Sequence, residues 1–436
     1  VSWKTARASV VSDKAAGGKK IDLAQGWKKK AALTALVRKW CEEKDNAVRM
    51  ESRMKTVIAI DSFKGSMTSM EAGNAAAAGV KAVFPDAEIV VRPLADGGEG
   101  TVEALTTGMG GRMETALVSD PLGRKISASY GILEKNKTAV IEMAAAAGLP
   151  LLSKEERNPL HTTTYGVGEL IRDAIRKGCR HFIVGIGGSA TNDGGVGMLS
   201  ALGFEFLDKS GQPVRNGAAG LADLAEIRSG HVLPVLKECT FRVACDVENS
   251  LCGELGCSSV FGPQKGADKK SIRQMDQWLF SYAQLTKEHF LQADENCPGA
   301  GAAGGLGFAF QSYLGARLEP GIRIVLEETG LEREMADADF VLTGEGRMDE
   351  QTAMGKAPVG VAKLAKKHGC TVIAFAGALQ EGFTVCHEIG IDAAFCIQKR
   401  AVSLEEAMDR DAAMQNLTDT CKEAFRLVKA VVGVPQ

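Results

Sequence analysis

Short apolar runs alternate with amphipathic segments in the first part of the chain. Residues 56–60 form an apolar, β-branched run that predicts a buried parallel strand. Thr68 and Glu71 have the spacing of a helix capping box, which predicts a helix after that strand. Residues 88–94 predict the next strand. A strand, a polar glycine-containing turn and a helix therefore follow one another, which is typical of an α/β protein.

The middle of the chain shows a different pattern. Segments 113–118, 125–133 and 138–143 predict short strands joined by turns without helices between them, which indicates a mixed or antiparallel sheet in a second domain. An amphipathic helix is predicted over 162–177, because its apolar residues recur with the helical period. From residue 340 onward the strand–turn–helix order returns, so the pattern at the two ends of the chain is the same.

Charge separates the first 53 residues from the rest. Residues 1–53 hold 13 Lys and Arg against 6 Asp and Glu, a net charge of +7, so the remainder carries −9 of the total of −2. An acidic main body argues against nucleic acid as the chief partner. A targeting or nucleic-acid-binding arm is one interpretation of residues 1–53. We favour a disordered or non-native extension ahead of a natural start at Met54.

Composition excludes several classes of protein. Glycine is frequent, at 50 of 436 residues, but it shows no three-residue period, so a collagen is excluded. The apolar fraction of 45% excludes disorder over most of the chain, and no apolar run reaches the ~18 residues that would span a bilayer. The 11 cysteines are irregularly spaced without a CxxC pair, which predicts reduced thiols and a cytoplasmic location.

The glycines gather in polar segments that follow predicted strands: 61–66, 96–101, 187–195, 262–266, 299–307 and 344–356. In open α/β sheets, ligands bind beyond the carboxyl ends of the strands, and glycine turns present N–H groups to anions. A single glycine-rich turn more often has no role beyond reversing the chain, but six such turns together predict a site that binds phosphate groups. The chain contains neither a Walker P-loop nor the triplets of protein kinases.

Phosphoryl transfer requires cations, carboxylates that hold Mg²⁺, and a base for the accepting hydroxyl. The glycine-flanked lysines are Lys64, Lys265 and Lys356, and the carboxylates near strand ends are Asp61, Asp96, Asp193, Asp246 and Asp349. Their structural alternatives are solvated surface lysines and aspartates that only cap helices or turns. No histidine lies within a glycine-rich segment, which disfavours a histidine base.

A dinucleotide-binding turn is the chief alternative. Residues 185–190 match G-x-G-x-x-A after a strand, and Glu205 and Asp208 lie at about the expected distance. Against this, Asp193 would place a carboxylate at the start of the following helix, where it would repel a pyrophosphate. Asp193 fits the role of a base or a metal ligand better.

Taken together, these segments resemble the type 1 glycerate kinase family. The matching stretches are 60–66, 93–101, 185–195, 245–249, 261–267, 301–307 and 343–352, with Gly355 and Lys356. They occur in order from Met54 to about residue 432, and residues 1–53 lie outside the pattern. The resemblance rests on all the motifs in order, since each alone is only moderately specific.

The resemblance implies ATP-dependent phosphorylation of D-glycerate with Mg²⁺, giving 2-phosphoglycerate in glycerate and glyoxylate metabolism, with 3-phosphoglycerate as an alternative product. It implies two α/β domains with the site between them. A Rossmann-like domain would comprise residues 54–111 and 300–436, and a mixed-sheet domain, 112–299, would be inserted within it. An NAD(P)-dependent oxidoreductase and a non-catalytic metabolite-binding protein are the competing hypotheses.

We therefore expect the following roles for site residues. Asp193, Lys64 and Asp61 are the expected catalytic residues, with Asp193 as the base, and Asp96 and Asp246 are the expected Mg²⁺ ligands. The expected substrate- or phosphate-binding residues are Ser66, Asp96, Gly97, Gly98, Gly187, Gly188, Ser189, Thr191, Gly194, Lys265, Gly304, Gly305, Thr352 and Lys356. The expected ligands are D-glycerate and ATP, without nucleic acid or membrane, and a homodimer is an open possibility.

Overall fold

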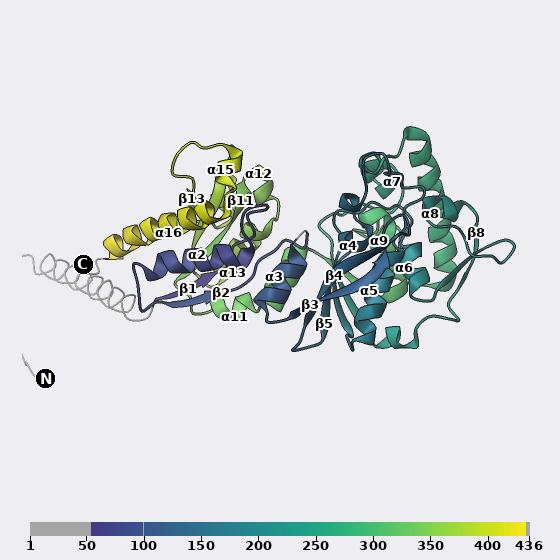
Figure 1. The fold of residues 1–436 in the computed structure, drawn as a ribbon, viewed down its shortest axis with the longest axis horizontal. Helices are drawn as coiled ribbons and strands as arrows, with labels where there is room; N and C mark the ends of the chain where they lie inside the picture. Colours follow the sequence, from purple (N-terminus) through teal and green to yellow (C-terminus); the bar gives the residue numbers. More distant parts are fainter. Residues whose placement is uncertain (1–53, 99, 433–436) are drawn as a thin grey trace, which may run out of the picture.

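A computed structural model describes residues 54–98 and 100–432. The chain forms two lobes, each built around a β-sheet (Figure 1). The first lobe holds a five-stranded parallel sheet in the order β13-β12-β11-β1-β2. Its strands come from both ends of the chain: β1 (Lys55–Ile58), β2 (Glu88–Val91), β11 (Phe340–Met348), β12 (Thr371–Leu379) and β13 (Ala393–Cys396). The predicted α/β fold class is confirmed.

Helices cover both faces of this sheet, because its central strands are apolar on both sides. Ile58 and Ile60 belong to a core shared with α2 (Ser69–Lys81) and α16 (Arg410–Val432). The alternate residues Val57 and Ala59 face a second core. That core includes residues of α10 (Gly321–Glu328), α11 (Leu331–Met335) and α13 (Ala357–Lys367). The short helices of this lobe are α12 (Glu350–Ala353), α14 (Val385–Ile389) and α15 (Leu404–Ala407).

The second lobe contains a six-stranded mixed sheet in the order β10-β9-β6-β5-β4-β3. Strands β3 (Arg112–Ser119), β4 (Lys125–Leu133) and β5 (Thr138–Glu142) pair antiparallel, as the closely spaced strand pattern predicts. Strands β6 (His181–Gly185), β9 (Thr240–Ala244) and β10 (Arg317–Glu319) extend the sheet from β5 in parallel. A separate hairpin consists of β7 (Glu205–Asp208) and β8 (Leu224–Arg228).

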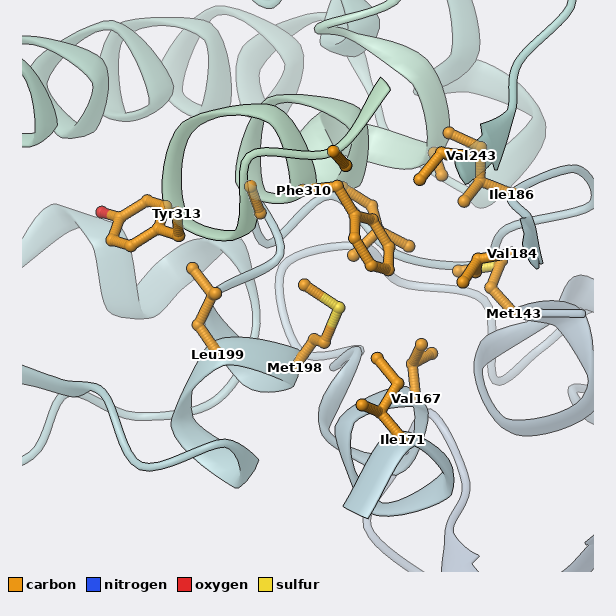
Figure 2. Packing of buried hydrophobic residues seen from close by; sticks show 14 of the residues in the cluster. Met143, Val167, Ile171, Val184, Ile186, Met198, Leu199, Val243, Phe310 and Tyr313 are labelled. Carbon is orange, nitrogen blue, oxygen red and sulfur yellow. The ribbon is translucent and has the colours of Figure 1, made fainter. Parts of the chain in front are cut away.

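An apolar core holds the helices of the second lobe against its sheet. Figure 2 shows Val167 and Ile171 of α5 (Tyr165–Arg176) close to Met198, with Phe310 lying toward the strand residue Val243. The remaining α-helices of this lobe are α4 (Ala144–Ala147), α6 (Val196–Ala201), α7 (Cys257–Phe261), α8 (Lys269–His289) and α9 (Ala302–Leu314). Its 3-10 helices are Leu149–Leu151, Ala218–Ala222, Pro234–Glu238 and Pro263–Lys265. In the described part of the chain, no helix is both long and apolar enough to cross a membrane.

The chain passes between the two sheets at two places. The first lies between β2 and α3 (Thr101–Gly108), which packs on β3, β4 and β5. The second lies between β10 and α10, so α9 and β10 belong with the mixed sheet although the expected boundary at residue 300 assigns them to the other domain. The amphipathic pattern of a helix does not indicate which sheet it covers. We propose that the chain is divided into two domains and that it returns from the second to the first near Gly321. Residues 1–53, the predicted extension, lie outside the described residues.

Candidate active site

Two pockets lie beyond the carboxyl ends of the strands. The β1–β11 pocket, of about 550 Å³, is lined by residues that follow β1, by the ends of β11 and β12, and by residues between 397 and 408. The β6–β9 pocket, of about 200 Å³, is lined by residues that follow β6 and β9, together with residues 261, 264, 302 and 303. Asp96 lines the first pocket, and its neighbours Gly97 and Gly98 line the second. The Asp96–Gly98 turn therefore borders both pockets.

The β1–β11 pocket lies where the sheet changes direction. Strands β1 and β11 are neighbours, but the chain continues from β1 to β2 on one side and from β11 to β12 on the other. Such a switch point leaves a crevice at the carboxyl ends of the strands, where α/β proteins bind ligands. The sheet topology thus explains why Asp61, at the end of the β1 segment, meets Glu345 of β11 in one pocket.

Asp61 is a buried carboxyl group on the wall of the β1–β11 pocket. Its Oδ1 accepts a hydrogen bond from the backbone N–H of Ser62 at 2.7 Å. The pKa of Asp61 is raised from its ordinary value of 3.8 to about 7, chiefly by burial and also by the negative charge of Asp96. The charge of Lys64 acts in the opposite direction. Asp61 can therefore gain or lose a proton near neutral pH, as a general base must.

Asp96 stands at the centre of a group of acidic side chains. Its Oδ1 accepts a hydrogen bond from Gly98 N at 2.9 Å, and its charge raises the pKa values of Asp61, Asp246 and Glu345. For Asp246 and Glu345 the larger cause of the raised pKa is burial. Several carboxylates held this close favour the binding of a cation.

These carboxylates fit a Mg²⁺ ion that arrives with phosphates. Mg²⁺ prefers oxygen ligands, and it is usually held by one or two carboxylates together with substrate phosphates and water. Among residues 54–98 and 100–432, no group of three or more His, Cys, Asp or Glu side chains is placed to hold a metal alone. Asp96 and Asp246, the sequence-predicted metal ligands, are therefore suited to a site that phosphate oxygens complete.

Three cationic side chains line the same pocket: Lys64, Arg347 and Lys356. Asp349 holds two of them, since its carboxylate lies 3.3 Å from Arg347 Nε and 3.6 Å from Lys356 Nζ. Ser66 also lines the pocket, and its buried Oγ has no hydrogen-bond partner in the described structure. The pocket thus combines cations and a free hydroxyl group with the carboxylates described above.

Thr352 has a different role from the predicted contact with phosphate. It is buried, and its Oγ1 donates a hydrogen bond to Glu345 Oε1 at 2.6 Å. Its backbone N–H donates to Oδ1 of Asp349, the N-cap residue of α12, at 3.2 Å. Thr352 therefore orients Glu345 and the start of α12 and is not one of the residues that line the β1–β11 pocket.

The β6–β9 pocket is lined mainly by backbone and small side chains. Gly187, Gly188 and Ser189 line it together with Gly97, Gly98 and Asp246. A Cβ atom on Gly187 would meet nothing within 4 Å, so this residue faces open space. The Oδ1 of Asp246 accepts a hydrogen bond from Gly321 N at 3.0 Å, which ties the wall of the pocket to the start of α10.

The second half of the 187–195 turn is buried beneath the pocket. Asp193 is 1% exposed, and it lines neither of the two pockets. Its carboxylate accepts hydrogen bonds from Thr164 N at 2.8 Å and Thr164 Oγ1 at 2.9 Å. Further donors are the backbone N–H groups of Gly195 and Gly197, at 3.1 and 3.2 Å. These surroundings favour a structural role for Asp193 over the expected role of catalytic base.

Lys265 lies in the same buried layer. It is 1% exposed, and its Nζ donates a hydrogen bond to the carbonyl oxygen of Thr191 at 2.7 Å. Burial lowers its pKa to about 8, while the negative charge of Asp193 acts in the opposite direction. Lys265 therefore supports the turn from below, whereas the sequence predicts a direct contact with phosphate.

Gly304 and Gly305 pack against this turn as well. Both adopt left-handed backbone conformations, and Gly304 O accepts a hydrogen bond from Gly194 N at 2.9 Å. A Cβ atom on Gly304 would lie 2.1 Å from the carbonyl oxygen of Thr191. These glycines, with Thr191 and Gly194, allow two backbone segments to touch, and none of the four lines either pocket.

We expect Gly304→Ala to lower the free energy of unfolding by at least about 2 kcal/mol more than Gly315→Ala. Both residues have a left-handed φ, of 68° and 60°, so the conformational strain is similar. A Cβ atom at Gly315 meets nothing within 4 Å, whereas one at Gly304 meets backbone. Urea unfolding of the two variants measures the difference. Equal losses would mean that the contact with Thr191 is unimportant.

The structure adds site residues that the sequence-based prediction omitted. Glu345 and Arg347 line the β1–β11 pocket because β11, which begins at Phe340, extends into the glycine-rich segment and ends only at Met348. The sequence did carry a signal for Glu345 and Arg347, since both lie within the glycine-rich segment 344–356. Ile397, Leu404 and Met408 also line this pocket. No glycine-rich turn or charge pattern marks these three, so the sequence carried no signal for them.

Comparison with known proteins identifies the family. The model of the glycerate kinase family matches residues 56–429. This chain belongs to the glycerate kinase family. A "Glycerate kinase" of Halalkalibacterium halodurans is 48% identical over 354 residues, which cover 81% of this chain and 93% of that protein. The "Glycerate 2-kinase" of Escherichia coli K12 has the same identity and coverage. A crystal structure of a candidate glycerate kinase 2 from Salmonella typhimurium LT2 has a TM-score of 0.81 and 43% identity, and covers 88% of this chain and all of that one.

Membership of the glycerate kinase family makes this chain an enzyme of the phosphotransferase class. The structure also shows how the 185–190 turn differs from a dinucleotide-binding turn. In that motif the glycines open directly into a helix whose N-terminus holds the pyrophosphate. Here α6 begins at Val196, and the buried Asp193 lies between the turn and the helix. Both observations favour a kinase over an oxidoreductase.

Proposed function

We propose that the chain transfers the γ-phosphoryl group of ATP to D-glycerate and forms 2-phosphoglycerate. The observation that carries this proposal is the Asp96–Gly98 turn, which borders a large pocket with cations and carboxylates and a small pocket lined by backbone. Two ligands bound in these pockets would meet at this turn. The names of the relatives, among them a glycerate 2-kinase, support glycerate as the acceptor and its 2-hydroxyl as the reacting group.

The small β6–β9 pocket is suited to glycerate. Its volume of about 200 Å³ matches a three-carbon acid better than a nucleotide. The Gly187–Ser189 turn offers backbone groups close to the ligand without side chains in the way, and a turn of this kind can bind a carboxylate. Asp246, one of the two expected Mg²⁺ ligands, also lines this pocket.

The β1–β11 pocket is suited to the phosphates of the nucleotide. Lys64, Arg347 and Lys356 supply positive charge, and the free hydroxyl group of Ser66 can donate a hydrogen bond. Mg²⁺, held by Asp96 and Asp246 together with phosphate oxygens, would neutralise the charge that develops during transfer. A pocket that offers cations to the phosphates and carboxylates to a metal ion is what nucleotide phosphates require.

Asp61 is the residue that we propose as the base. In the transfer, a glycerate hydroxyl oxygen forms a bond to the γ-phosphorus, the bond from that phosphorus to the bridging oxygen breaks, and ADP leaves. The proton of the hydroxyl group passes to a carboxylate. Asp61 has the raised pKa that this step requires, it lines the β1–β11 pocket, and it is close enough to feel the charge of Asp96, whose turn borders both pockets. Lys64, whose charge acts on Asp61, is placed to bind phosphate oxygens.

A coupled assay tests the proposed function. We expect ADP release from Mg-ATP only when D-glycerate is present, and a product that enolase dehydrates directly, because enolase acts on 2-phosphoglycerate. A product that enolase accepts only after addition of phosphoglycerate mutase would overturn the regiochemistry but not the kinase activity. Failure to release ADP, with NADH binding in its place, would overturn the kinase itself. A cytoplasmic location and a homodimer stay predictions, and light scattering would test the latter.

A further inference from the structure

Part of the β1–β11 pocket is apolar, and we call this part its apolar end. It is lined by Ile397, Leu404, Ala407 and Met408, with the amide side chains of Gln380 and Gln398. Leu404 is 76% exposed and Met408 is 37% exposed. Large apolar side chains at a pocket wall lose contact with water when a ligand covers them, and such surfaces commonly mark binding sites.

The segment that carries these side chains is held in place beside the turn that carries Lys64. It connects β13 with α16 across the carboxyl edge of the parallel sheet, as the loop with α15 in Figure 1 shows. Arg410 anchors its end, since Arg410 Nε donates to Glu71 of α2 at 3.0 Å. Met408 reaches the turn that carries Lys64, because a Cβ atom on Gly65 would lie 2.5 Å from Met408 Cε. The apolar side chain of Met408 therefore lies next to the turn that supplies one of the cations of the pocket.

We infer that this apolar end binds the purine base of the nucleotide, and that residues 397–408 determine the affinity for it. The inference rests on the proposed function, because it places the nucleotide whose phosphates meet Lys64, Arg347 and Lys356. A purine ring gains from contact with aliphatic side chains on its faces. The amides of Gln380 and Gln398 can each donate and accept a hydrogen bond at its edge.

The charge of the pocket selects this occupant over an apolar peptide. The pocket is lined by the apolar side chains of Leu404 and Met408, by three cations and by the carboxylates of Asp61 and Asp96. A nucleoside triphosphate with Mg²⁺ brings the complementary groups: an apolar ring, an anionic chain and a cation. The volume of about 550 Å³ also lies within the range of small-ligand pockets.

Leu404→Asp tests this inference, with Leu427→Asp as the matched control. Both leucines are exposed, at 76% and 61%, but Leu427 lies on α16 and does not line the pocket. We expect Leu404→Asp to raise the Kd for ADP, measured by calorimetry without glycerate, at least about 10-fold. The KM for ATP should rise in parallel while the KM for glycerate stays unchanged. Leu427→Asp should leave the Kd for ADP within about twofold.

The possible outcomes separate the two proposals. If Leu404→Asp binds ADP as the wild type does, or if both variants lose affinity equally, residues 397–408 do not hold the base, although glycerate phosphorylation can still stand. A third outcome is that the wild type binds ADP and Leu404→Asp does not, but that the wild type fails to phosphorylate glycerate. This outcome would support the nucleotide site and would contradict glycerate as the acceptor. Absence of ADP binding to the wild-type protein would overturn the nucleotide site itself. Because Leu404 is exposed, an unchanged Tm is expected to accompany these measurements.

Discussion

Replacing Asp61 with Asn is expected to lower kcat for glycerate phosphorylation at least about 100-fold, because general-base catalysis contributes roughly 10²–10⁴ to such rates. The amide has almost the same shape as the carboxyl group, and it keeps an oxygen that can accept the hydrogen bond from Ser62 N. It cannot accept the proton of the glycerate hydroxyl group. Steady-state kinetics at pH 8, where the wild-type carboxylate is ionised, measures the loss. A variant that retained more than about a tenth of kcat would exclude Asp61 as the base.

The pKa of Asp61 also predicts the pH dependence of the wild type. With a pKa of about 7, the ionised fraction falls about tenfold for each pH unit below 7, so kcat/KM should fall by the same factor and level off above 7. Asp349→Asn is a matched control, because neighbouring Lys356 and Arg347 help to lower the pKa of Asp349. In this variant, kcat/KM should still decrease below about pH 7, as in the wild type. A wild-type profile that is flat between pH 5 and pH 8 would contradict the assignment.

The same raised pKa has a consequence for stability. A carboxyl group whose pKa is raised by folding stabilises the folded protein only while it is protonated. Stability from Asp61 is therefore full below its ordinary pKa of about 4 and is lost as the pH rises through about 7. At pH 8 the ionised group costs roughly 4 kcal/mol, so Asp61→Asn should unfold at a higher urea concentration than the wild type. Loss of activity with a gain of stability is the signature of a strained catalytic group.

Asp193→Ala is expected to lower the free energy of unfolding by at least about 3 kcal/mol. The substitution removes the acceptor of hydrogen bonds from Thr164, Gly195 and Gly197, and a buried donor left without a partner costs about 1–3 kcal/mol. It also leaves the buried cation of Lys265 without the nearby negative charge. Urea unfolding at pH 7 measures the loss.

Asp193→Asn distinguishes the structural role from the sequence-based hypothesis of a base. The amide keeps the volume but offers one oxygen fewer to the surrounding donors, so we expect an intermediate loss of stability. The remaining activity should still decrease below about pH 7, because Asp61 is unchanged. A variant of wild-type stability whose kcat is at least 100-fold lower would instead support Asp193 as the base.

The strands and the helix caps illustrate what could be predicted locally. The apolar run at 56–60 contains most of β1, which spans Lys55–Ile58 and is buried, and Thr68 with Glu71 forms the predicted capping box of α2. Both depend on residues that are neighbours in the chain. The predicted domain boundary at residue 300 does not depend on chain neighbours in this way. Contacts with distant strands decide whether α9 and β10 lie with one sheet or the other.

The sequence by itself determined the α/β class, the order of the glycine-rich segments and, through them, the family. These features are set by local backbone preferences and by the types of residue at fixed spacing. Only the tertiary structure decided which glycine turns face a pocket and which pack against one another, as Gly187 and Gly304 show. It also decided that Asp61 has a pKa near neutrality while Asp193 is enclosed by donors. Burial and the nearby charge of Asp96 raise the pKa of Asp61, and both depend on contacts between residues that are far apart in the sequence.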